Sequence, residues 1–416
     1  MISKKKRSVN PTRRKMNKDK EMRIIRTFHP IGQGAFYSER FYGEQKTFNV
    51  VYDCGVQNVS DRHKKFVQQS FTRDDKINYL FISHLDEDHI SLVTTLRNSV
   101  GFIRQVVLPY ISPREVMIHK ILAQSLGLTE VYGFWSMVYD AMEGRLNDDM
   151  SFLFVSSEDE VTNQVNHNRI IPGGTQLSSN CPDWVFIPYN KHAERKTELE
   201  NNLKKLVQNL GFQKALRQIG VTIDSVEELK NKITNADFAN LMLSQAIRDY
   251  LKDAYKDITG TINQNSLLVY SGPSKEENSY RMDLHAFCPF EIKASRMSRL
   301  CEYCLSYPFS RKYVACLYTG DSDLDMKGYK QEFQTLWTNV GTIQLPHHGS
   351  YASFKFDKNK DEFDKLYVFP VSCGETNSYG HPSSKVLDFL MANDCLPVVV
   401  TENASTRYSQ VIIGRH

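Results

Sequence analysis

Two histidines and three acidic residues lie close together in the stretch FISHLDEDHISLV, which spans residues 81–93. The run before it, INYLF, is mostly apolar and predicts a strand buried on both faces. A strand that ends in a turn directs its next side chains into a small volume, and divalent metals in proteins are bound by imidazole and carboxylate groups. The spacing HxDxDH therefore predicts a metal site formed by His84, Asp86, Asp88 and His89. The alternative interpretation is a solvated acidic loop.

Further short motifs stand before and after this stretch. In chain order they are GQG at 32–34, VVYDCG at 50–55, YTGD at 318–321, HHGS at 347–350 and YGHP at 379–382. The HxDxDH stretch resembles the HxHxDH motif of the metallo-β-lactamase superfamily, with Asp86 where the second histidine usually stands. Within that superfamily, the set of motifs resembles the nuclease domain of the ComEC type, found on competence DNA-uptake channels. The resemblance covers about residues 23–112 and 263–401.

The resemblance implies an α/β fold, an αββα sandwich, with a metal centre. One or two divalent ions, Zn²⁺ or Mn²⁺, would be held by His84, Asp86, Asp88, His89, Asp321 and His347, and the carboxylate of Asp321 would bridge them. Replacing an imidazole by the Asp86 carboxylate makes the ligand set richer in oxygen, which shifts its preference toward Mn²⁺.

The same motifs supply candidate catalytic residues, which are Asp88, His348 and His381. His348 and His381 could be a ligand, a proton donor to the leaving oxygen or a phosphate contact. A structural histidine bonded to the backbone is the alternative for each. Asp53, at a strand end, is expected to support the ligand loop rather than bind metal. Asn377 is expected to support the site from the loop that carries His381.

Two departures from the family pattern bear on function. Ala35 replaces the acidic residue that often follows GQG, and no membrane channel segments accompany the domain. No apolar run approaches the roughly 18 residues that cross a bilayer, and the N-terminus lacks the apolar part of a secretory signal. We therefore expect a stand-alone, soluble, cytoplasmic relative with no membrane partner, to which DNA uptake itself does not carry over.

The chain divides into segments of different composition. Residues 1–22 form a basic arm, with nine Lys or Arg against the single Asp19 in the first 20 positions. Such an arm could bind a phosphate backbone or be a solvated tail. We predict the two halves of the sandwich at 23–190 and 261–416, and a helical insertion at 191–260 between them. The first half begins with a three-strand meander. The second alternates strands with one helix in SSKVLDFLMAN.

The chain has eight cysteines, and three of them lie in a short Cys/His insertion at 281–310. The spacing HxxC, a loop and CxxC is typical of structural zinc, and its candidate ligands are His285, Cys288, Cys301 and Cys304. The alternative is that they are ordinary buried residues. The other five, which we expect in the core, are Cys54, Cys181, Cys316, Cys373 and Cys395.

The leading functional hypothesis is a metal-dependent hydrolase that cleaves phosphodiester bonds, most simply a nuclease acting on nucleic acid. One alternative is a small-molecule hydrolase, such as a cyclic nucleotide phosphodiesterase or a lactonase, because a fold does not fix a substrate. Another is a non-catalytic subunit that binds a protein partner through the helical insertion. Serine catalysis is disfavoured because no GxSxG elbow is present and neither Ser83 nor Ser350 has an identifiable third partner. A Walker phosphate loop is also absent.

Overall fold

The computed structural model describes residues 21–43, 47–146, 150–157, 169–190, 195–232, 266–276, 280–283 and 313–415, and single residues at 238, 242, 244, 247, 249 and 250. The basic arm up to residue 20 and the candidate zinc ligands His285, Cys288, Cys301 and Cys304 lie outside the described residues.

The described strands form two sheets. The first has nine strands in the order β11-β16-β1-β2-β3-β4-β5-β6-β7. Their bounds are β1 Glu21–Phe28, β2 Gly34–Tyr42, β3 Phe48–Val56, β4 Lys76–Phe81, β5 Phe102–Pro109, β6 Ser151–Ser156, β7 Arg169–Pro172, β11 Tyr280–Asp283 and β16 Tyr408–Arg415. The second has seven strands in the order β15-β14-β13-β12-β10-β9-β8. Their bounds are β8 Leu177–Ser178, β9 Trp184–Asn190, β10 Leu267–Pro273, β12 Ala315–Tyr318, β13 Val340–Ile343, β14 Val368–Ser372 and β15 Leu396–Val400.

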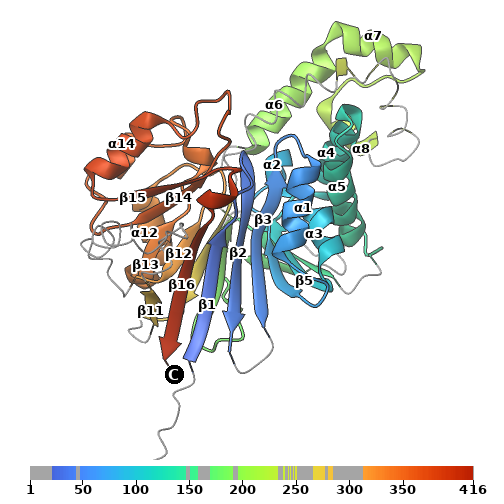
Figure 1. Cartoon of the computed structure of the whole chain (residues 1–416). Helices are drawn as coiled ribbons and strands as arrows, with labels where there is room; N and C mark the ends of the chain where they lie inside the picture. Colours follow the sequence, from blue (N-terminus) through green and yellow to red (C-terminus); the bar gives the residue numbers. More distant parts are fainter. Residues whose placement is uncertain are drawn as a thin grey trace, which may run out of the picture.

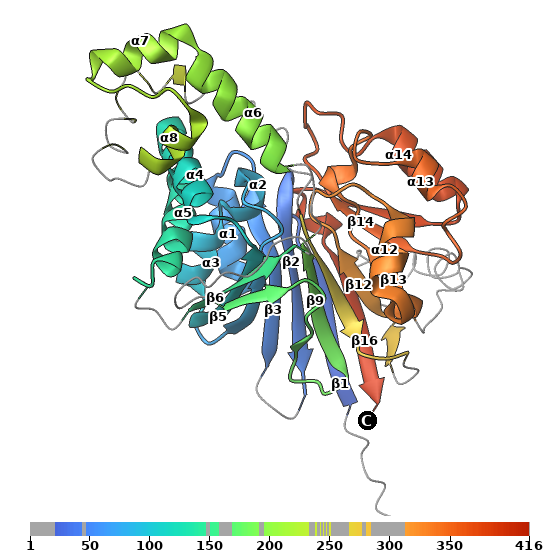
Figure 2. The same cartoon turned by 180° about the vertical axis from the view of Figure 1, so that it is seen from behind.

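Helices cover the outer face of each sheet, as Figures 1 and 2 show from opposite sides. The helices on the first sheet are α1 Asp61–Ser70, α3 Val93–Ser99, α4 Pro113–Leu126 and α5 Thr129–Met142. Those on the second are α12 Met326–Phe333 and α14 Ser384–Ala392. Short helical turns lie in the connections, at α2 Glu87–Ile90, η2 Gln334–Asn339, η3 His347–Gly349, α13 Phe356–Asn359 and η4 Ala404–Thr406. The layer order is therefore helix, sheet, sheet, helix, which confirms the αββα sandwich.

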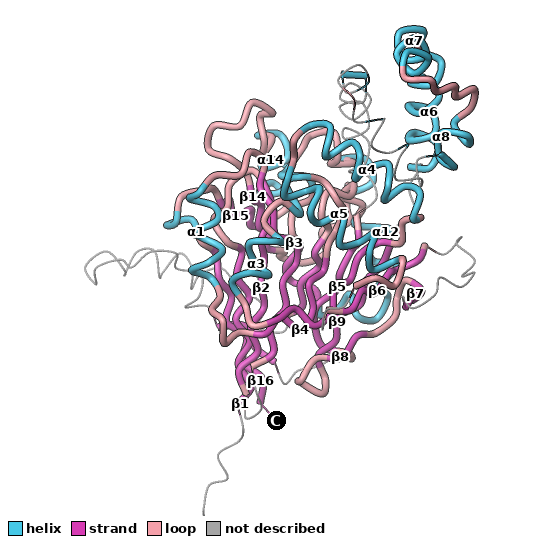
Figure 3. Tube along the Cα trace, turned by 90° about the vertical axis from the view of Figure 1, so that its right-hand side faces the viewer, coloured by secondary structure: helices cyan, strands magenta, loops and turns pink. Residues whose placement is uncertain are grey.

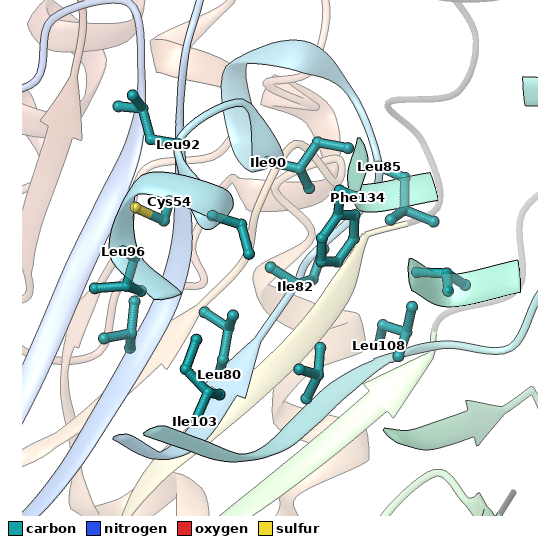
Figure 4. Packing of buried hydrophobic residues seen from close by; sticks show 14 of the residues in the cluster. Cys54, Leu80, Ile82, Leu85, Ile90, Leu92, Leu96, Ile103, Leu108 and Phe134 are labelled. Atoms are coloured by element: carbon teal, nitrogen blue, oxygen red, sulfur yellow. The ribbon is translucent and has the colours of Figure 1, made fainter. Parts of the chain in front are cut away.

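Strand β4 shows why the sequence builds layers. Side chains alternate between the two faces of a strand. Leu80 belongs to the apolar cluster under α1, α3, α4 and α5, whereas its neighbour Phe81 belongs to the cluster between the two sheets. The strand is thus covered on both faces, as the apolar run predicts. Figure 4 shows the outer cluster, where Leu80 and Ile82 lie among side chains of β5 and of the helices, Phe134 among them.

The predicted meander is confirmed, because β1, β2 and β3 are neighbouring antiparallel strands. Strand β16 was not predicted, although it pairs antiparallel with the whole of β1, from Glu21 opposite Arg415 to Phe28 opposite Tyr408. The two sheets also do not correspond to the two sequence halves. Strand β9 precedes the helical segment and joins the second sheet, whereas β11 and β16 come late and join the first.

The helical segment has a small core of its own. Its described helices are α6 Arg195–Gln208, α7 Leu210–Gln218 and α8 Val226–Lys232. Phe212 and Leu216 of α7 are buried in a cluster that also contains Met117, Ile118 and Ile121 of α4. The segment is therefore attached to the sandwich through α4, and Figures 1 and 3 place it beyond the sandwich, next to α4.

The described residues include the five cysteines expected in the core. These cysteines, Cys54, Cys181, Cys316, Cys373 and Cys395, are all buried, as predicted. Among the described helices, none combines the length and apolar character needed to cross a membrane.

Candidate metal centre

The first group of predicted ligands lies at the C-terminal end of β4. His84 follows the strand by three residues, and the single turn α2 carries Asp88 and His89. This turn packs directly on the end of β3. A Cβ added to Gly55 would lie 2.5 Å from the backbone carbon of His89, so only glycine permits so close an approach.

Three residues of this group converge. His84, Asp88 and His89 each offer a ligand atom, and these atoms lie within 4.8 Å of one another. The Nε2 atom of His84 is 3.8 Å from Oδ2 of Asp86, and Nε2 of His89 is 3.9 Å from Oδ1 of Asp88. All four residues of HxDxDH therefore face a common volume.

The carboxylate of Asp321, which follows β12, lies between two sets of histidines. Its Oδ1 atom is 3.2 Å from Nε2 of His89. Its Oδ2 atom is 3.9 Å from Nε2 of His84 and 3.8 Å from Nε2 of His347. Asp321 thus has the position that a bridging carboxylate would need.

The HHGS loop brings two more histidines to the site in an unusual backbone conformation. His347, His348 and Gly349 have φ values of 49°, 53° and 76°, all in the left-handed region. That conformation costs a residue with a side chain about 1–3 kcal/mol and is kept only where the surroundings impose it. Here Nε2 of His348 lies 3.2 Å from Oδ2 of Asp88, and its Nδ1–H donates to the carbonyl oxygen of Ser372 at 2.8 Å. His89, Asp321 and His348 form a second possible ligand group.

The buried polar atoms at the centre fit a cation. The Nε2 atom of His89 and Oδ1 of Asp321 are both buried, yet neither makes a well-aligned hydrogen bond. Buried polar atoms in native proteins nearly always have a partner, and an ion is one way of supplying it. The donor set of imidazole nitrogens and carboxylate oxygens suits zinc or manganese.

The charges of these groups are strongly coupled. Burial alone would lower the pKa of His89, but the carboxylates of Asp321, Asp53 and Asp88 raise it well above its ordinary value. Burial would raise the pKa of Asp321, but His89 and His347 hold it well below its usual range. A proton on His89 therefore balances these carboxylates when no cation is bound, and a cation would take the place of that proton.

Asp53 holds His89 from the side opposite Asp321. Its Oδ2 accepts from Nδ1–H of His89 at 2.8 Å and from the hydroxyl of Ser83 at 2.7 Å, while its Oδ1 accepts from the backbone N–H of Ser83 at 2.7 Å. Asp53 is fully buried with a left-handed φ of 55°. Its contacts leave Nε2 of His89 facing Asp321, which is the geometry of a supporting residue.

Two serines that the sequence analysis did not select complete the surroundings of the histidines. The hydroxyl of Ser83 is 3.0 Å from Nδ1 of His84 and 3.1 Å from Nδ1 of His89. The hydroxyl of Ser266 accepts from the backbone N–H of Asp321 at 2.8 Å and lies 3.3 Å from Nδ1 of His84. A lone serine carries no sequence signal for such a role. Because Ser83 is fully buried and donates to Asp53, its hydroxyl cannot reach a substrate.

The glycine of TGD is required by this crowding. Gly320 has a left-handed φ of 55°, and an added Cβ would lie 2.6 Å from Cβ of Ser83 and 2.8 Å from Cβ of Ser266. The motif thus brings β12 close enough to β4 for Asp321 to reach His89.

His381 stands beside the site, held by Asn377. The side-chain oxygen of Asn377 accepts from the backbone N–H of His381 at 2.9 Å, and its amide nitrogen donates to the carbonyl oxygens of His381 and Gly374 at 2.6 and 2.7 Å. The ring of His381 is 5.7 Å from that of His347 between centroids. Burial and the neighbouring His348 and His347 lower the pKa of His381 to about 4, so its ring is neutral at physiological pH. Asn377 therefore positions this loop through the backbone.

The chain has only low similarity to known proteins in the comparisons made by sequence and by structure. No protein-family model and no curated protein matches the chain. Among solved structures, the metallo-β-lactamase fold protein YhfI from Bacillus subtilis aligns with 94% of this chain and 99% of its own, at 6% identity and a TM-score of 0.33. MEM-A1, a subclass B3 metallo-β-lactamase from a soil metagenome library, covers 56% of this chain and 93% of its own, at 9% identity and a TM-score of 0.21. MIM-1, a metallo-β-lactamase from Novosphingobium pentaromativorans, covers 57% of this chain and 89% of its own, at 12% identity and a TM-score of 0.22. Identities and TM-scores this low carry no activity over to this chain.

Proposed function

We propose that this protein is a metal-dependent hydrolase that cleaves phosphodiester bonds, and most simply a nuclease. The observation that carries the proposal is the position of Asp321, whose two carboxylate oxygens face different histidines, His89 on one side and His84 and His347 on the other. A single carboxylate shared by two ligand groups is the arrangement expected of a paired metal centre.

The residues divide into two sets around Asp321. One cation would be held by His84, Asp86 and His347, and the other by Asp88, His89 and His348, with Asp321 common to both. When bound, such a pair lowers the pKa of water to near neutrality and stabilises charge that develops on phosphoryl oxygens. The ligand set is compatible with Zn²⁺ and with Mn²⁺.

The protein's own groups would orient the reaction. Asp53, Ser83 and Ser266 fix the rings of His89 and His84 from behind, so the two Nε2 atoms are held toward the centre. His381 carries a neutral ring next to His347, where its N–H could donate to a phosphoryl oxygen without adding a charge. The rings of His84 and His89 are positioned by hydrogen bonds before substrate arrives, which is the condition for efficient electrostatic catalysis.

The substrate class separates the nuclease from the small-molecule alternatives. We would incubate the purified protein with Mn²⁺ or Zn²⁺ and, in separate reactions, labelled single-stranded DNA, double-stranded DNA, RNA, a cyclic nucleotide and a lactone. Cleavage of polynucleotides supports the nuclease. Turnover of the cyclic nucleotide or the lactone alone would replace it with a small-molecule hydrolase. No turnover of any substrate by metal-loaded protein would favour the non-catalytic alternative.

A matched pair of variants tests the site itself. Asp321→Ala removes the shared carboxylate and should abolish activity and lower the bound metal measured by elemental analysis. Asp323→Ala, two residues away, removes a half-buried carboxylate paired with Lys355 at 3.4 Å and should change neither. Full activity or full metal content in a folded Asp321→Ala protein would refute the proposed centre.

A further inference from the structure

Two exposed tyrosines stand on the loops that carry the candidate centre. Tyr351 directly follows HHGS and is 53% exposed, and Tyr379 opens YGHP and is 56% exposed. Among the described residues, one other aromatic side chain is exposed, Tyr42, and it is less exposed, at 38%. Aromatic rings usually bury much of their surface, so two open rings on the site loops call for a functional reason.

The two loops form one structural unit. The backbone N–H of Ser383 donates to the carbonyl oxygen of Gly349 at 3.0 Å. A Cβ added to Gly349 would lie only 2.6 Å from Cβ of Pro382, so the loops are in direct contact. Tyr351 and Tyr379 are therefore carried by two segments whose relative position is fixed.

Tyr379 is connected to the centre through two successive ring contacts, the first stacked and the second edge-on. Its ring lies 5.7 Å from that of His381 with an interplanar angle of 27°, and His381 in turn lies 5.7 Å from His347. The side-chain amide of Gln57 donates to the Tyr379 hydroxyl at 2.8 Å, which holds the ring from the end of β3. The ring of Tyr379 is thus held in place and is separated from the candidate metal ligand His347 by one residue, His381.

A lysine side chain lies next to the ring of Tyr351. The Nζ atom of Lys385, on the first turn of α14, lies 5.2 Å from the centroid of the Tyr351 ring. Phe356 supports the ring on its inner side, with centroids 5.2 Å apart. An exposed ring beside an exposed lysine combines a surface for stacking with a charge for a phosphate group.

We propose that Tyr351 and Tyr379 are stacking platforms for unpaired bases, so that the substrate of this centre is a single-stranded polynucleotide. The proposal rests on the proposed phosphodiesterase function. Single-stranded nucleic acids are bound by aromatic side chains on which bases stack, next to basic groups that contact the backbone. The faces of bases inside a duplex are covered by their neighbours, so the same rings select against double strands. A protein partner that buries the tyrosines is the competing occupant.

Binding without cleavage tests the proposal. In an Asp88→Ala background, which prevents turnover, we would measure the affinity for labelled oligothymidylate, oligouridylate and a mixed-sequence duplex by fluorescence anisotropy. The single strands should bind more tightly than the duplex. Tyr351→Leu and Tyr379→Leu should each weaken binding of single strands about tenfold or more, because a stacked base contributes strongly to affinity. The two single strands distinguish DNA from RNA.

Three controls make the result specific. Tyr351→Phe keeps the ring and should bind as the parent does, and Tyr379→Phe, which keeps the ring but loses the contact from Gln57, should bind much more tightly than Tyr379→Leu. Gly34 at the start of β2 approaches Asp88, whereas Tyr42 is at the other end of the strand. Tyr42→Leu therefore removes an exposed ring far from the centre along this strand and should have no effect. Leucine variants that bind single strands like the parent, or that weaken duplex binding equally, would overturn the proposal. Such a result would leave the proposed function standing if the unmodified protein cleaves phosphodiesters, whereas a failure of cleavage itself would remove that function first.

Discussion

Nε2 of His348 lies 3.2 Å from Oδ2 of Asp88, and this contact joins two parts of the fold that are far apart in the chain. Asp88 belongs to the turn after β4 in the first sheet, and His348 lies between β13 and β14 of the second. The other nitrogen of His348 is bound to the carbonyl oxygen of Ser372 at the end of β14. The candidate centre therefore depends on how the two sheets are placed against each other.

Ser266 should control metal affinity without binding metal. Its hydroxyl holds the backbone of Asp321 and lies next to Nδ1 of His84, so Ser266→Ala would free both residues to move. Residues that orient metal ligands typically contribute about 10–100-fold to affinity. We expect a loss of that size, measured by competition with a chelating indicator.

The control for this prediction is Ser322→Ala. Ser322 is also fully buried and adjoins Asp321, but its hydroxyl is paired with that of Tyr329 on α12, at 2.9 Å. Its removal should leave the metal affinity within about threefold of the parent, a span of under 1 kcal/mol. Equal losses in the two variants would mean that general packing, rather than ligand orientation, sets the affinity.

Breaking one buried ion pair of the first sheet should strongly destabilise the protein. Arg26 of β1 and Glu39 of β2 are almost completely buried and 2.6 Å apart, and Glu39 also accepts from Ser271 and Tyr318 of the second sheet. Glu39→Gln leaves the arginine charge without its counter-ion, and breaking such a pair costs about 3–5 kcal/mol. Urea unfolding measures this loss in the free energy of unfolding.

Asp140→Asn is the control for this prediction. It breaks the ion pair between Asp140 and Arg145, whose side chains are 45% and 54% exposed, and should cost less than about 1 kcal/mol.

His29 should make the protein less stable in mild acid. Burial, together with the charges of Arg407 and Arg40, holds the pKa of His29 well below the usual value, and Nε2 of its ring contacts the Ser38 hydroxyl at 2.7 Å. The unfolded chain takes up a proton on this residue near pH 6.5, whereas the folded protein does not. The contribution of His29 to the free energy of unfolding is therefore fully present above that pH and falls as the pH drops toward the lowered pKa.

The measurement is urea unfolding at pH 7.5 and pH 5 for the parent and for His29→Gln. The variant should show a smaller difference in stability between the two pH values, whatever its absolute stability. An unchanged difference would mean that other groups account for the acid sensitivity.

The local part of the candidate site was predictable from the sequence. The acidic and imidazole groups of HxDxDH are at most five positions apart in the chain, and the apolar run before them fixes where their strand ends. A strand followed by one helical turn already brings His84, Asp88 and His89 close together, and Asp53 of β3 then fixes the orientation of His89. Helix α14 and the meander of β1, β2 and β3 follow from equally local patterns of apolar and turn-forming residues.

What the tertiary structure decided is the set of contacts between segments distant in the chain. The motif resemblance pointed to Asp321, but only the packing of the sheets directs its two oxygens to different histidines. Ser266 has no motif at all, and its role exists because β10 begins beside His84. Strand β16 likewise depends on the available edge of β1. Periodicity records which face of an element is apolar, whereas the partner of that face, and the atoms that meet there, are selected only when the whole core is packed.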